Sequence, residues 1–219
     1  MEFPIEDNNA KIEDLNDLQR FYEIVENADV KVANLNDLQR FQIISVKNFC
    51  NVNFDQRIKI DKSIENNYFQ PSTLHYKSID TRNFPLKYDD TFFFSDLYLK
   101  FFHFCYEIFD GFKISEKNKN ISWCYRSNKF DHDCVWHSHF FSCTINGVYY
   151  YSVDNDGIYF EKNGEVIYYL PEQNELLIFP NYLNHKPEVA TSEKLRYSIN
   201  MEITTEETSL TLFERYGLP

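Results

Sequence analysis

The stretch CTINGVYYYSVDNDGIYFEKNGEVIYYLPEQNELLIFP, residues 143–180, decides the fold class of this chain. It consists of short segments rich in β-branched and aromatic residues, which favour strands, separated by turn sequences. Asn163-Gly164 suits a two-residue β-hairpin. Short strands at this close spacing indicate a sandwich or barrel rather than βαβ units. We predict strands over residues 143–153, 157–160, 165–170 and 175–180, and over 121–126 and 195–203 on either side.

The residues that precede this region have a helical pattern in two places. Ser95 to Phe109 is the clearer helix, since Ser95 can cap its start and Gly111 follows its end. KIEDLNDLQRF (11–21) recurs as KVANLNDLQRF (31–41), which is a duplication at a period of 20 residues. We predict that residues 1–50 form a helical N-terminal extension that packs on a main domain of residues 51–219. Partner binding is the alternative role for the extension.

The composition is that of a folded, acidic protein. The chain has 219 residues, of which 43% are hydrophobic and 18% aromatic, and its net charge is −12. This charge disfavours general binding to nucleic acids and to anionic membranes. The five cysteines include no Cys-x-x-Cys pair, which favours reduced thiols. The polar, acidic start is no signal peptide, and no apolar run approaches the roughly 18 residues of a membrane span. We therefore expect a cytoplasmic protein.

The histidines form the strongest chemical signal. VWHSHFF (135–141) places His137 and His139 two residues apart, so on a strand both imidazoles point to the same face. His185 follows a strongly apolar strand and the Phe179-Pro180 break. A late strand end can lie beside an early strand and complete a site there. The three side chains are candidate metal ligands, because neutral imidazole is the commonest one in proteins. The alternative is that they are core or surface histidines that happen to align.

The sequence around these histidines resembles a known family. Four elements occur in order: His137-Ser-His139, Gly147-Val-Tyr-Tyr150, Phe179-Pro-Asn-Tyr-Leu-Asn-His185 and Arg196-Tyr-Ser198. Their order and spacing resemble the Fe(II)- and 2-oxoglutarate-dependent oxygenases, and within them the prolyl-hydroxylase-like group that phage and marine bacterial genomes commonly encode. The resemblance covers residues 121–203. It implies a double-stranded β-helix, or jelly roll, that would lie in the host cytoplasm if the chain is phage-encoded.

The resemblance also assigns roles to residues. It implies that His137, His139 and His185 bind Fe(II), and that Arg196 binds the distal carboxylate of 2-oxoglutarate with help from the Ser198 hydroxyl. A guanidinium can bind a carboxylate through two parallel hydrogen bonds, which a lysine cannot do. Two tyrosines are further candidates to line the cosubstrate pocket: Tyr125 and Tyr149. The implied activity is that of a dioxygenase, most simply a hydroxylase, acting with dioxygen on a small molecule or a peptide.

One departure from the family pattern changes the electrostatics. The broader superfamily binds iron through two histidines and one carboxylate, whereas His139 occupies the carboxylate position here. Three neutral ligands leave the site with a charge of +2 rather than +1 before the cosubstrate binds. Two alternatives follow: Asp131 or Asp133 supplies an oxygen ligand, or the site prefers Zn(II), Ni(II) or Cu(II). Two milder departures are Asn146, where the family often has serine, and Tyr151, where it often has leucine.

Two other functions compete with this interpretation. The first is a jelly-roll protein that binds a partner or has a structural role without catalysis, since such folds carry many unrelated functions. The second is a cupin-like metalloenzyme that uses three histidines and needs no 2-oxoglutarate. Such an enzyme would tolerate the loss of Arg196. Nothing in the sequence indicates an oligomeric state.

Overall fold

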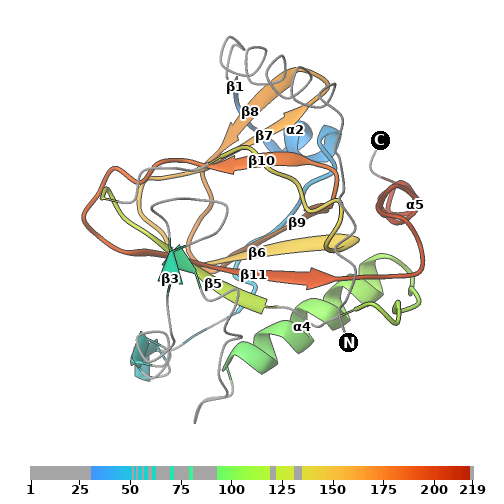
Figure 1. Ribbon diagram of the computed structural model, residues 1–219, viewed down its shortest axis with the longest axis horizontal. Helices are drawn as coiled ribbons and strands as arrows, with labels where there is room; N and C mark the ends of the chain where they lie inside the picture. The colour runs from blue at the N-terminus through green and yellow to red at the C-terminus, as the bar shows by residue number, and fades with distance from the viewer. Residues whose placement is uncertain are drawn as a thin grey trace, which may run out of the picture.

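Two mainly antiparallel β-sheets form the centre of the protein (Figure 1). The computed structural model describes residues 31–50, 52, 54–55, 57–58, 61–62, 70–71, 79–80, 93–118, 122–130 and 135–217. In this part of the chain the larger sheet has seven strands in the order β2-β9-β6-β11-β5-β4-β3, and the smaller has four in the order β1-β8-β7-β10. All pairs are antiparallel except β1 with β8.

The strands and main helices have the following bounds. The larger sheet contains β2 (Ile44–Val46), β3 (Gln70–Pro71), β4 (Ile79–Asp80), β5 (Ser122–Ser127), β6 (Ile145–Ser152), β9 (Glu175–Pro180) and β11 (Arg196–Ile203). The smaller sheet contains β1 (Lys31–Val32), β7 (Ile158–Lys162), β8 (Glu165–Tyr169) and β10 (Asn184–Pro187). The helices are α2 (Leu35–Arg40), α4 (Phe93–Ile108) and α5 (Ser209–Arg215).

The central strands of the larger sheet are buried on both faces. One face packs on α4, whose Leu97 and Phe101 lie in one hydrophobic cluster with Tyr149 of β6 and Met201 of β11 (Figure 1). Gly147 permits this close approach, because a Cβ atom there would lie 2.5 Å from the Phe101 ring. The other face packs on the smaller sheet through a second cluster. Its members include Val148 and Tyr150 of β6, Phe160 of β7, Ile167 of β8 and Leu177 and Phe179 of β9.

The predicted mostly β class with flanking helices is confirmed, and so is most of the predicted element order. The six predicted strands correspond to β5, β6, β7, β8, β9 and β11. Asn163 and Gly164 have φ angles of 56° and 82°, as a tight hairpin of this type requires. The helix near 95–110 begins at Phe93, so Ser95 lies inside it rather than at its cap. Its end matches the prediction, since Gly111 has φ 80° and donates to the Tyr106 carbonyl.

Residues 31–50 differ from the expected helical extension. Only Leu35–Arg40 is helical there, and it begins with a capping box in which Asn34 and Asp37 bond reciprocally. The flanking β1 and β2 join the smaller and the larger sheet. Leu38 is buried in the cluster between the two sheets. This segment is therefore part of the sheet core, whereas the first copy of the duplication lies outside the described residues.

None of the described helices is both long enough and apolar enough to cross a membrane.

Candidate metal centre

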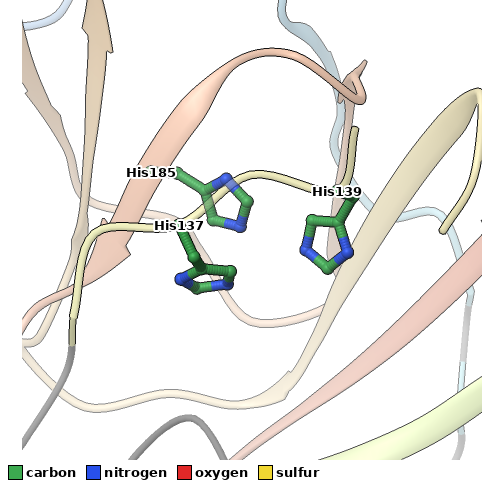
Figure 2. A group of neighbouring side chains, drawn as sticks. All are labelled: His137, His139 and His185. Carbon is green, nitrogen blue, oxygen red and sulfur yellow. The ribbon is translucent and has the colours of Figure 1, made fainter. Parts of the chain in front are cut away.

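Two segments far apart in sequence place the three histidines together (Figure 2). His137 and His185 form an antiparallel bridge, in which each backbone N–H donates to the carbonyl of the other at 3.0 and 2.9 Å. His185 lies on β10, which pairs with β7 of the smaller sheet. The sequence did not reveal β10, because Asn-His-Lys-Pro has no strand pattern. His139 is fixed separately, since its N–H donates to the Asn181 carbonyl at 2.8 Å.

The three imidazole rings surround one common space (Figure 2). The ring centroid of His185 lies 4.3 Å from that of His137 and 5.1 Å from that of His139, and the His137–His139 separation is 5.4 Å. One nitrogen from each ring lies within 4.8 Å of the others. The structure therefore brings together the three residues that the sequence selected, close enough for one ion to contact all of them.

Each ring has an acceptor at its Nδ1 atom. The Nδ1 atoms of His137 and His185 lie 3.0 Å from the carbonyls of Val135 and Leu183. That of His139 lies 2.6 Å from Oε1 of Glu202. Donation from Nδ1 fixes the tautomer and leaves a lone pair on Nε2, which is how metal-binding histidines are usually oriented. The Nε2 atom of His139 is buried and has no hydrogen-bond partner among the described residues. This orphaned acceptor fits a metal ion.

Glu202 is a residue of this site that the sequence analysis missed. It lies on β11 and is 5% exposed, and its Oε1 also accepts from the Ser142 hydroxyl at 2.8 Å. The sequence contained a signal for it. Arg196, Ser198 and Glu202 are spaced by even numbers of residues on one strand, so their side chains share a face. Cys143 also lies close to His139 and Glu202, but burial raises the pKa of its thiol and keeps it neutral.

Arg196 lies buried in the same cavity as the three histidines. It is 3% exposed, and its Nε and one terminal nitrogen donate to Ser127 Oγ and to the Glu188 carbonyl, both at 3.1 Å. Both acceptors are neutral, and no carboxylate of the described chain forms an ion pair with it. A buried charge without an ion-pair partner is costly. The guanidinium is therefore suited to an anion that enters the cavity.

The remaining cosubstrate candidates divide between the cavity and the core. Ser198 and Tyr125 line the cavity and are neighbours across β11 and β5. Tyr149, the other tyrosine predicted for the pocket, is not among the residues that line the cavity. Its ring packs in the α4 cluster, where its hydroxyl donates to Asn174 Oδ1 at 2.9 Å. The next residue, Tyr150, lines the cavity instead. Successive side chains of a strand point to opposite faces, so an error of one position selects a core residue in place of a residue that lines the cavity.

The other walls of the cavity are mainly apolar. Burial raises the pKa of Tyr150, with a smaller opposing effect from Arg196, so this tyrosine is a neutral phenol that can donate a hydrogen bond. Trp123, Val148, Ile158 and Pro187 contribute apolar surface. Asp131 and Asp133, the alternative ligands, lie outside the described residues. The cavity thus combines three convergent imidazoles, one buried guanidinium and an apolar lining.

Three of the solved structures that match this fold have names that belong to one class of enzymes. An oxidoreductase of the 2OG-Fe(II) oxygenase family from Burkholderia pseudomallei matches with a TM-score of 0.56 and 11% identity over 82% of this chain and 97% of its own. A prolyl hydroxylase from Trichoplax adhaerens, in complex with a hypoxia inducible factor peptide fragment, matches at 0.58 and 12% over 96% and 97%. The non-heme alpha-ketoglutarate-dependent epimerase SnoN from nogalamycin biosynthesis matches at 0.54 and 7% over 84% and 82%.

These matches confirm the resemblance to the 2OG-Fe(II) oxygenase superfamily at the level of the fold. At the level of sequence, no family model and no curated protein matches this chain.

Proposed function

We propose that this protein is an Fe(II)- and 2-oxoglutarate-dependent oxygenase, most simply a hydroxylase, whose two sheets form a double-stranded β-helix core. The observation that carries the proposal is the content of one cavity: three convergent imidazoles and a buried guanidinium that has no ion-pair partner in the described chain. The three imidazoles suit a metal ion, and the guanidinium suits a carboxylate. The shared fold with 2OG-Fe(II) oxygenases supports this assignment.

The metal would be held by His137, His139 and His185 through their Nε2 atoms. Their Nδ1 contacts orient the rings before any ion binds, so little ordering is required on binding. Three ligands leave positions open for other molecules, as a catalytic rather than a structural site requires. Bound Fe(II) would activate dioxygen, with 2-oxoglutarate as a two-electron reductant: one oxygen atom would pass to the cosubstrate, which loses carbon dioxide to give succinate, and the other to the substrate.

The remaining residues would bind and orient the cosubstrate. Arg196 can bind a carboxylate with its guanidinium, and Ser127 and the Glu188 carbonyl hold the guanidinium in place. The Ser198 and Tyr125 hydroxyls lie on the same wall and can add hydrogen bonds. The apolar lining limits the access of water, which strengthens these charged contacts. A small molecule or a peptide is the expected substrate, and the prolyl hydroxylase among the structural neighbours supports a peptide.

An anaerobic titration with Fe(II) and 2-oxoglutarate tests this function. We expect a weak visible absorption band from charge transfer between the metal and the bound keto acid. Arg196→Ala should abolish cosubstrate binding and leave metal binding largely intact. Arg215→Ala is a matched control, because this arginine also donates to two backbone carbonyls, those of Phe109 and Gly111, but lies outside the cavity lining. Absence of the band at saturating concentrations would contradict the proposal.

A three-histidine metalloenzyme that does not use 2-oxoglutarate is the second candidate. The all-nitrogen ligand set favours it, because such a set suits Zn(II), Ni(II) and Cu(II) as well as iron. The two candidates differ at Arg196. A cosubstrate-independent enzyme would retain its activity in Arg196→Ala, whereas the oxygenase would lose it. Elemental analysis of the purified protein identifies the metal and also distinguishes both enzymes from a non-catalytic protein of the same fold.

A further inference from the structure

Strand β11 carries two buried, oppositely charged side chains: Arg196 lines the cavity, and Glu202 lies behind the His139 ring. Arg196 lies at the start of the strand, and Glu202 lies six residues further on the same face. Both side chains are buried, at 3% and 5% exposure. The Arg196 guanidinium suits an anion. The Glu202 carboxylate needs a partner of positive charge, because a buried charge without one is costly.

Within the described chain, the ion-pair partner of Glu202 is His139, and the neutral thiol of Cys143 also lies close to the carboxylate. The contact joins Oε1 to Nδ1 at 2.6 Å, and the Ser142 hydroxyl donates to the same oxygen at 2.8 Å. No lysine or arginine of the described residues forms an ion pair with this carboxylate. The imidazole that touches Glu202 also has a buried, unpartnered Nε2 atom. A chain of contacts thus runs from the Glu202 carboxylate through the His139 ring to its unpartnered Nε2 atom, which lies in the histidine cluster.

A cation at the end of this chain would give the His139 Nε2 atom a partner and would place a positive charge near the buried Glu202 carboxylate. It would occupy Nε2 of His139 and lie one imidazole away from the Glu202 charge. Hydrogen bonding of a carboxylate to the far nitrogen makes a ligating imidazole a stronger donor and fixes its orientation. The three ring ligands are neutral, so the negative charge of Glu202 would reach the metal through the His139 ring. The sum of the metal and this carboxylate is +1, which equals the charge of a site with a direct carboxylate ligand.

We propose that Glu202 is a positioning residue that acts through His139 and supplies indirectly the negative charge that the three-histidine ligand set lacks. This inference rests on the proposed function, because it requires a metal at the histidine cluster. Glu202 fixes the His139 ring, increases its donor strength and lowers the effective charge of the site. Ser142 holds the carboxylate in the required orientation.

The decisive variant is Glu202→Gln, since glutamine preserves the shape and can still accept from His139 while it removes the charge. We expect Fe(II) affinity, measured anaerobically by competition with a chelator, to fall by about 10–100-fold, the usual cost of losing a group that supports a metal ligand. At saturating Fe(II), 2-oxoglutarate should bind at least as tightly as to the unaltered protein, because the site is then more positive towards a dianion. A structural defect would weaken both ligands together.

Glu175→Gln is the matched control. Glu175 is also a buried glutamate, and it accepts from Ser45, from Tyr169 and from the Glu172 backbone, with no contact to any histidine that the structure describes. Loss of this charge should leave both affinities unchanged. Substitution with Co(II) adds a spectroscopic signature, since the ligand-field bands should shift in Glu202→Gln and not in Glu175→Gln. Should Glu202→Gln fail to fold, Ser142→Ala should show a smaller loss of Fe(II) affinity in the same direction.

The outcomes separate this inference from the proposed function. Unchanged Fe(II) affinity in Glu202→Gln, or a parallel loss of Fe(II) and 2-oxoglutarate, overturns the role of Glu202 while metal binding stands. Absence of metal binding by the unaltered protein overturns both. If Fe(II) binds and depends on Glu202 but 2-oxoglutarate does not bind, the role of Glu202 is supported and the oxygenase assignment fails.

Discussion

The two faces of the larger sheet carry different chemistry although the same strands make both. On the helix face, which packs on α4, Tyr149, Ile199 and Met201 belong to a closed hydrophobic cluster. On the cavity face, their immediate neighbours Tyr150 and Ser198 line the cavity. A shift of one residue along β6 or β11 thus separates a side chain that stabilises the fold from one that contacts a ligand. Substitutions at adjacent positions of one strand should therefore change stability and function separately.

The largest expected effect is the loss of a ligand on the cavity side. His185→Ala should abolish measurable Fe(II) binding, because it removes one of three convergent nitrogens while the backbone bridge to His137 is retained. The free energy of unfolding of the metal-free protein should change less than the metal affinity does. Chelator competition and urea unfolding measure the two quantities. His103→Ala is the control, since His103 is exposed on α4 and lies outside the cavity lining.

If His185→Ala retained the Fe(II) affinity of the unaltered protein, the histidine cluster would not be the metal centre. The cavity face would then have no assigned role in metal binding.

The helix face should show the opposite result. Met201 is fully buried among the residues that contact α4. Met201→Ala leaves a cavity there and should lower the free energy of unfolding by about 2–5 kcal/mol. Fe(II) affinity should not change, because Met201 points away from the histidines. Urea denaturation with and without the metal checks both statements. A marked loss of metal affinity in a protein of normal stability would show that the two faces are not independent.

The sequence predicted most strands but not the face to which each side chain points. The turn at Asn163-Gly164 and the β-rich segments indicated β5 to β9 and β11 without any structural information. In β6, however, aromatic residues fill both faces, so no alternation of polar and apolar residues marks the site. The choice of Tyr149 over Tyr150 could not be corrected from such a pattern. Only the packing of α4 against one face, which Gly147 permits, determines it.

The candidate site was predicted in part, for a related reason. The His-x-His spacing identified His137 and His139, although the structure places His137 in an isolated β-bridge and His139 in a loop rather than on one strand. The order of motifs added His185 and Arg196. The strand β10 that carries His185 was not predicted, because four polar and proline-containing residues resemble a loop. Glu202 was not selected, although it continues the even spacing of Arg196 and Ser198. Its importance depends on a contact with a residue 63 positions away, and a single sequence does not encode that contact in any local pattern.

The smallest expected effect, and the sharpest comparison, comes from the adjacent tyrosines. Tyr149→Phe removes the hydrogen bond to Asn174 on the helix face and should lower the free energy of unfolding by about 0.5–1.5 kcal/mol without altering 2-oxoglutarate affinity. Tyr150→Phe removes a neutral hydroxyl from the cavity wall, near Arg196, and should weaken 2-oxoglutarate by a few-fold with little change in stability.

The pair is informative because the two substitutions are chemically identical and one residue apart. Each variant serves as the control of the other, so any general effect of losing a tyrosine hydroxyl cancels. Thermal unfolding reports the core, and titration of 2-oxoglutarate at saturating Fe(II) reports the cavity. The two faces are distinct only if Tyr149→Phe lowers the stability and Tyr150→Phe lowers the affinity for 2-oxoglutarate. An equal loss of cosubstrate affinity in both variants would mean that the packing on α4 controls the shape of the cavity, because Tyr149 can reach the ligand only through the sheet itself.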